Sequence, residues 1–84
     1  MKEEKQTTVR KMRAGQRGKV VEIRGGEHLA SRLNALGIRP GKQITKVSSM
    51  IMRGPATIQV DRSQVAIGFG MAGKIVVEVE RGEA

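Results

Sequence analysis

A glycine motif near the C-terminus is the first feature of the sequence that could carry chemistry. Residues 68–73, Gly-Phe-Gly-Met-Ala-Gly, match the pattern Gly-x-Gly-x-x-Gly. In dinucleotide-binding proteins this pattern lies between a strand and a helix, and an acidic residue about 20 positions later contacts the ribose. Here a predicted strand follows the motif, and only eleven residues remain after Gly73. The motif therefore predicts a tight connection, with Met71-Ala72 in a single helical turn, rather than a nucleotide site.

The sequence offers few other side chains for catalysis or metal binding. His28 is the only histidine, and a transition-metal site with Glu27 and Glu22 needs several ligands to converge. We predict a surface histidine on a helix, with an adventitious or interfacial metal as the alternative. Asp61 lies in a predicted hairpin turn, which is a common structural position for Asp. Cysteine is absent, which excludes thiol nucleophiles and Cys-based metal sites, and no Ser-His-Asp set can be argued. We therefore expect a protein that is not an enzyme and has no cofactor, and we assign no residue as a metal ligand.

The charge of the chain indicates an anionic partner. Sixteen Lys and Arg against eight Asp and Glu leave +8 over 84 residues, and residues 1–42 hold eleven of the basic groups. Nucleic acid, an acidic protein face and anionic headgroups all fit this excess, and a merely soluble Arg-rich surface is the alternative. Phe69 is the only aromatic residue, and single-strand binders normally stack bases on aromatics. We therefore expect nucleic acid to be an improbable partner, reduced to salt-sensitive backbone contacts.

The chain contains no candidate membrane or secretion segment. A bilayer span needs about 20 consecutive apolar residues, and no such run occurs. The first eight residues carry two acids and no apolar stretch, unlike a secretory signal. We expect a cytoplasmic domain without direct membrane insertion.

The elements that position these residues are mostly strands. Leu29, Leu33 and Leu36 recur at helical spacing and predict one helix over residues 27–36, which Gly37 and the Pro40-Gly41 turn would end. Runs rich in β-branched and alternating apolar residues predict strands over residues 19–24, 42–52, 56–60, 64–67 and 74–79. This pattern favours a mostly β fold, a small SH3-like barrel of about five strands with one inserted α-helix. We expect a flexible N-terminal arm over residues 1–8, the domain over residues 9–80 and a tail over residues 81–84.

Four methionines contribute to a core that lacks aromatics. Met12, Met50, Met52 and Met71 are expected to fill gaps in that core. Because Met50-Ile51-Met52 places apolar side chains on both faces of one strand, an exposed interface is the alternative for this segment.

The spacing of these residues resembles a known family. Val9-x-x-Met12-x-x-Gly15-x-x-Gly18-x-Val20 is followed by Gly25-Gly26 and by the most specific segment, Arg32-Leu-x-x-Leu-Gly-Ile-x-Pro-Gly41. The pattern looks like the FeoA family of bacterial ferrous-iron transport proteins over roughly residues 8–80. The resemblance implies an SH3-like barrel with a helical insertion and a cytosolic protein without its own chemistry. Such proteins are similar to accessory subunits of FeoB, a membrane transporter for ferrous iron that carries a GTP-binding domain.

From this resemblance and from the charge we derive a docking hypothesis. His28, Arg32 and Arg39, here called the helix lip, and the exposed part of Met50–Met52 are expected to contact the cytosolic region of the transporter. We expect no small-molecule substrate. A second hypothesis follows from residues 18–25, Gly-Lys-Val-Val-Glu-Ile-Arg-Gly, which resemble the opening of a KOW-type barrel. Under that hypothesis the protein binds RNA or the ribosome or transcription machinery.

Overall fold

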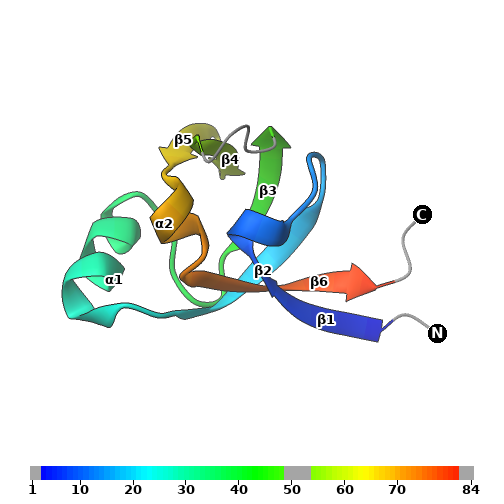
Figure 1. Ribbon diagram of the computed structural model, residues 1–84, viewed down its shortest axis with the longest axis horizontal. Helices are drawn as coiled ribbons and strands as arrows, with labels where there is room; N and C mark the ends of the chain where they lie inside the picture. Colours follow the sequence, from blue (N-terminus) through cyan, green and yellow to red (C-terminus); the bar gives the residue numbers. More distant parts are fainter. Residues whose placement is uncertain (1–2, 49–53, 82–84) are drawn as a thin grey trace.

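Six antiparallel strands form one curled sheet in the computed structural model, which describes residues 3–48 and 54–81 (Figure 1). The order across the sheet is β1-β6-β2-β3-β4-β5. The mostly β, SH3-like prediction is confirmed. The bounds of the elements in chain order are β1 Glu3–Thr8, the 3-10 helix η1 Val9–Lys11, β2 Arg17–Ile23, α1 Gly26–Ala35, β3 Gln43–Ser48, β4 Ala56–Val60, β5 Ser63–Ile67, α2 Phe69–Ala72 and β6 Ile75–Arg81.

Strand β1 occupies most of the segment for which the sequence predicts a flexible arm. It pairs with β6 from Glu3 opposite Arg81 to Thr8 opposite Val76. The segment is polar, so it lacks the apolar alternation that marks a half-buried strand. Its backbone nevertheless pairs with the outer edge of β6, because ladder hydrogen bonds need no apolar side chain. The result is a sixth strand at the edge of the sheet.

Two irregularities in register accompany the curl of the sheet around the core. One lies in β2 between Val20 and Glu22, and the other in β3 between Lys46 and Ser48. Bulges of this kind bend a strand and increase its twist. The buried residues enclosed by the sheet, η1, α1 and α2 form one cluster: Val9, Met12, Val20, Leu33, Ile38, Ile44, Ile58, Val60, Ile67, Ala72, Ile75, Val77 and Val79.

Helix α1 lies at one end of the molecule and begins and ends within a residue of its predicted range (Figure 1). Gly37 and Gly41 have φ values of 89° and 94°, so both predicted positive-φ positions are confirmed. The three leucines from which the helix is predicted differ in burial. Leu33 is fully buried and Leu29 half-buried, but Leu36 is 44% exposed. The reason is that Leu36 is the C-cap residue, where the chain leaves the helix axis.

The glycine motif forms the predicted single turn, α2, and leads directly into β6. Strands β4 and β5 form a hairpin in which Val60 pairs with Ser63 across the two-residue turn Asp61-Arg62. Met12 is buried and Met71 packs partly buried against the core, as predicted. The predicted strand over 42–52 is shorter, since β3 ends at Ser48, and Met50 and Met52 lie outside the described residues.

Candidate functional site

The helix lip is exposed and comes from two adjacent segments. His28 and Arg32 lie on α1, four residues apart, and therefore project from the same face of the helix. Arg39 lies in the turn that follows α1. Its Nη1 donates a 3.5 Å hydrogen bond to Oδ1 of Asn34, which ties that turn back to the helix. The structure thus places His28 and Arg32 on one face of α1, while Arg39 contacts Asn34, which is two residues from Arg32 and projects from another face of the helix.

Leu36 lies next to this surface, although it shares the helical spacing of Leu29 and Leu33, from which the sequence predicts the helix. It is the C-cap residue of α1, four residues after Arg32, and its side chain is exposed. Leu36 also follows Leu33 by three residues and Leu29 by seven, which are helical spacings too, so periodicity alone could not separate the two faces. This face of α1 therefore combines the imidazole of His28 and the guanidinium of Arg32 with one exposed apolar side chain.

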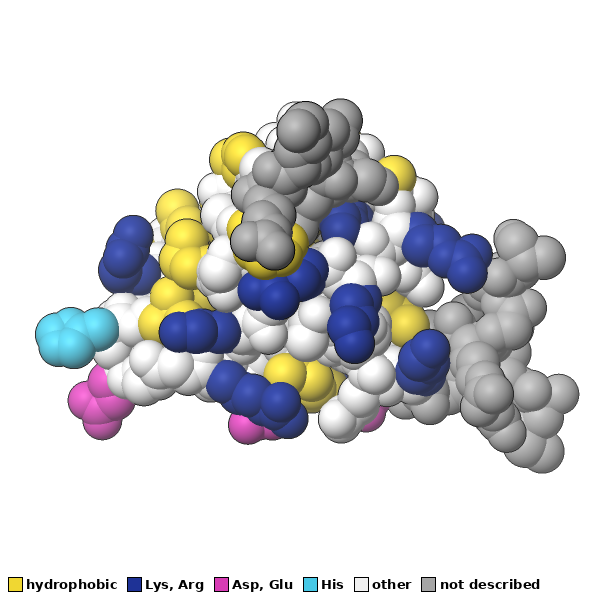
Figure 2. Space-filling model, in the orientation of Figure 1, with side chains coloured by type: hydrophobic (Ala, Val, Ile, Leu, Met, Phe, Trp, Pro, Cys, Tyr) yellow, Lys and Arg dark blue, Asp and Glu magenta, His cyan; other side chains and the backbone are white. Residues whose placement is uncertain are grey.

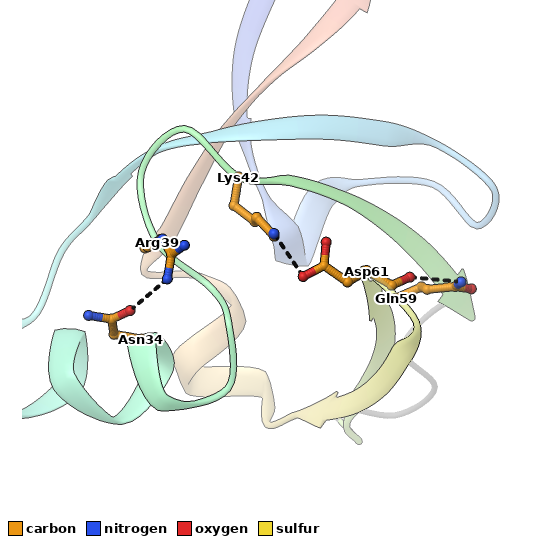
Figure 3. A network of polar contacts seen from close by, with 5 residues as sticks. All are labelled: Asn34, Arg39, Lys42, Gln59 and Asp61. Carbon is orange, nitrogen blue, oxygen red and sulfur yellow. Dashed lines mark hydrogen bonds and ion pairs between the residues drawn. The ribbon is translucent and has the colours of Figure 1, made fainter.

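Figure 3 shows the contact of Arg39 with Asn34 and, separate from it, a set of polar contacts at the β4–β5 hairpin. Lys42 Nζ lies 2.7 Å from Asp61 Oδ2, and the Lys42 side chain is 26% exposed. Gln59 Nε2 donates to the backbone oxygen of Asp61 at 3.3 Å. Asp61 has a φ of 56°, a left-handed conformation that Asp tolerates better than most residues. Asp61 therefore serves the turn structurally, as predicted, and also neutralises Lys42.

Figure 2 shows the charge on one face of the molecule. Lys and Arg side chains are spread across that face, and acidic side chains are visible only along its lower rim in this view. In the described part of the chain, two ion pairs occur, Lys42 with Asp61 and the exposed pair Arg24 with Glu22. Most basic side chains in that part are therefore available to an anionic partner.

Lys46 is a buried lysine that the sequence analysis did not single out. It lies on β3, is only 1% exposed, and its ammonium group donates to three backbone oxygens, those of Val9, Arg10 and Met12, at 2.9, 3.2 and 2.7 Å. All three N–H donors of the ammonium are used. Burial lowers the pKa of Lys46 by removing water from the charged form. A lysine with a lowered pKa can act as a nucleophile, but this one is enclosed and fully hydrogen-bonded, so its role is to hold η1 on the core.

Arg10 explains the last glycine of the Gly-x-Gly-x-x-Gly motif. Its guanidinium carbon lies 3.9 Å from the centre of the Phe69 ring, and Nε and Nη2 donate to the Phe69 oxygen at 3.3 and 3.1 Å. A Cβ at Gly73 would lie 2.5 Å from Arg10 Nη2, so the guanidinium occupies the space above that glycine. The motif thus anchors α2 to η1, whereas nothing in the structure explains glycine at positions 68 and 70.

The described residues contain neither a cluster of metal ligands nor a candidate membrane-spanning helix. Within residues 3–48 and 54–81, no three His, Cys, Asp or Glu side chains gather where they could hold a metal ion. None of the helices in that part of the chain is long and apolar enough to cross a membrane.

The comparison with known protein families covers nearly all of the described residues. The model of the FeoA domain matches residues 7–79. The chain belongs to the FeoA domain family. It is therefore a small protein associated with ferrous iron transport, and the resemblance found in the sequence is confirmed.

Solved structures extend this FeoA-family assignment. The crystal structure of an iron uptake regulatory protein, FeoA, is 35% identical to this chain, with a TM-score of 0.81 and coverage of 89% of this chain and 97% of that one. The solution structure of FeoA from Chlorobium tepidum is 18% identical, with a TM-score of 0.80 and coverage of 93% and 74%.

A manganese-dependent transcriptional repressor shares the fold at 19% identity and a TM-score of 0.80, with 88% of this chain matched to 41% of the repressor. No curated protein sequence matches the chain.

Proposed function

We propose that this FeoA-family protein is a cytoplasmic, non-catalytic docking module for the cytosolic region of a FeoB-type membrane iron transporter. The observation that carries the proposal is the exposure of the helix lip residues His28, Arg32 and Arg39, together with the exposed apolar side chain of Leu36 at the end of α1. Membership of a ferrous-iron transport family supplies the biological context.

The chemistry of the lip suits a protein interface. Exposed arginines raise the rate of encounter with an acidic surface, and burial of an apolar side chain holds the complex afterwards. Met50 and Met52 belong to the proposed surface on sequence grounds alone, because they lie outside the described residues. The module needs no metal, cofactor or small-molecule substrate of its own in this proposal.

Charge reversal on the lip tests the proposal. We expect Arg32→Glu and Arg39→Glu each to weaken binding to the full-length transporter in nanodiscs by about fivefold, chiefly through slower association. Arg13→Glu is the matched control, because Arg13 is also exposed but lies in the turn before β2, away from α1 (Figure 1). Met52→Asp tests the remaining segment. Circular dichroism and thermal unfolding establish that each variant is folded.

Two results would contradict the docking proposal. One is unchanged transporter binding by Arg32→Glu, Arg39→Glu and Met52→Asp while all three remain folded. The other is an equal loss with Arg13→Glu, which would indicate a response to net charge rather than to this surface.

The KOW-like hypothesis predicts a different response. One face of the only aromatic ring, that of Phe69, is covered by Arg10, so this ring offers at most one face for base stacking. A salt titration with duplex and single-stranded RNA tests the hypothesis directly. Binding to RNA that persists at moderate ionic strength would favour it over transporter docking.

A further inference from the structure

A second surface lies on the outer face of strands β2, β3 and β4. Arg17 pairs with Thr45, and Thr45 pairs with Gln59, so the three residues form one row across three strands. Their neighbours Gly18, Ile44 and Val60 are buried on the opposite face. Together with Gln43 and Asp61, the row lines an open depression of about 410 Å³, here called the cross-strand groove. Every side chain that lines it is polar.

The cross-strand groove has a charged end and a neutral end. Arg17 is exposed and takes part in no ion pair within the described residues, so its guanidinium is free to bind an anion. At the other end Asp61 is paired with Lys42 at 2.7 Å, but its carboxylate remains 65% exposed. An incoming acid is therefore attracted towards Arg17 and not towards the Asp61 end, where the charges of Asp61 and Lys42 cancel. This difference would set the direction in which a ligand lies.

The neutral side chains match the groups of a peptide backbone. Gln43 and Gln59 each present an amide, which donates and accepts like a peptide group, and Thr45 does the same through its hydroxyl. Two interstrand spacings place the ends of the row roughly 10 Å apart, about the length of three extended residues. A single phosphate or carboxylate cannot span that distance. A nucleic acid would place repeated phosphates along it, including next to Asp61.

We propose that the cross-strand groove binds an extended acidic segment of a partner protein. One carboxylate of the segment pairs with the Arg17 guanidinium, which can grip it bidentately, and the backbone beside it hydrogen-bonds Thr45, Gln43 and Gln59. The segment runs from Arg17 towards the β4–β5 turn with an uncharged residue next to Asp61. This surface is separate from the helix lip, and its function does not depend on the transporter.

The test uses a capped pentapeptide, acetyl-Val-Glu-Val-Thr-Val-amide, and the same peptide with Gln in place of Glu. Titration into the ¹⁵N-labelled full chain at 150 mM NaCl is followed by amide chemical shifts. We expect the Glu peptide to shift the amides of Arg17, Thr45 and Gln59, and the Gln peptide to bind about fivefold more weakly. Arg17→Gln should cause a similar loss for the Glu peptide, whereas the control Arg62→Gln should change its affinity less than twofold. Both variants remove one positive charge from an exposed position.

Asp61→Asn gives a change in the opposite direction. It leaves the Lys42 ammonium without its partner carboxylate at this end of the groove, and Asn tolerates the left-handed conformation at this position, so affinity for the Glu peptide should rise. The proposal is overturned if Arg17→Gln and Arg62→Gln weaken binding equally, since that indicates non-specific attraction. It is also overturned if the shifts centre on other residues. A third refuting result is that inorganic phosphate or a short single-stranded RNA binds the groove as tightly as the peptide.

Discussion

Replacing the buried Lys46 by Met is the sharpest test of how this small domain is held together. Methionine keeps an unbranched stem of similar length and removes the ammonium group. That group joins β3 to three backbone oxygens in and beside η1, those of Val9, Arg10 and Met12. If these contacts position η1, the variant should lose stability even though it adds an apolar side chain to an apolar site.

The expected loss of stability follows from the backbone oxygens that no longer receive a hydrogen bond from Lys46. The Val9 oxygen keeps a hydrogen bond from the Met12 amide, at 3.2 Å. The Arg10 and Met12 oxygens receive no other hydrogen bond in the described residues, and the contact to Met12 is buried. A buried polar group without a partner costs about 1–3 kcal/mol, and two such groups set an upper range of about 2–6 kcal/mol. Removing the buried charge offsets part of this loss. We therefore expect about 2–4 kcal/mol.

Urea unfolding monitored by circular dichroism measures this loss. A domain of this size has a total stability of about 4–12 kcal/mol, so Lys46→Met should lower the midpoint strongly or leave the chain unfolded at 25 °C. Lys19→Met is the matched control, because Lys19 is exposed on the adjacent strand β2 and should change stability by less than about 0.5 kcal/mol. A change below about 0.5 kcal/mol for Lys46→Met would refute the role assigned to Lys46.

The pH dependence of unfolding gives a second test of how Lys46 contributes to stability. Burial lowers the pKa of Lys46 from its ordinary value of 10.5. Between the lowered folded value and 10.5 the unfolded chain binds more protons, so the contribution of Lys46 to stability should rise with pH in that window. The stability difference between the wild type and Lys46→Met should therefore grow as pH approaches 10.5. A difference that shrinks with rising pH would show that the folded pKa is raised instead.

Three further substitutions test separate packing features by urea unfolding. Gly73→Ala should cost about 1 kcal/mol, because its Cβ displaces the Arg10 guanidinium from the Phe69 ring, and the cost should vanish in an Arg10→Ala background. Leu33→Ala should cost about 2–5 kcal/mol, because Leu33 is fully buried. Leu36→Ser should cost less than about 1 kcal/mol, because Leu36 is exposed. A loss for Leu36→Ser equal to that for Leu33→Ala would place Leu36 back in the core.

Local signals in the sequence account for the elements that were predicted correctly. Gly37 and Gly41 end α1 and form the next turn because their positive φ values suit only a few residue types. The hairpin of β4 and β5 follows from alternating apolar residues around a short polar turn. In each case the residues that determine the structure lie within a few positions of it.

The features that were missed depend on contacts between distant segments. Strand β1 is polar and is held by the backbone of β6, more than 60 residues later in the chain. Lys46 has the appearance of an ordinary strand lysine, and only the fold brings the oxygens of residues 9–12 to its ammonium, over 34–37 positions. The cross-strand groove arises from the register of three strands, which no motif encodes. Neither the composition of the chain nor the periodicity of its apolar residues indicates these contacts between distant segments.

The structure divides the basic residues behind the net charge of +8 into those that stabilise the fold and those that are exposed to a partner. Lys46 is buried, Arg10 is stacked on Phe69, and Lys42 is paired with Asp61, so these three charges serve the fold. Arg32 and Arg39 on the lip and Arg17 in the groove remain exposed and take part in no ion pair in the described part of the chain. An argument from net charge treats all of these residues alike. Reversing Arg17 or Arg32 should therefore alter partner binding, whereas removing Lys46 should alter folding first.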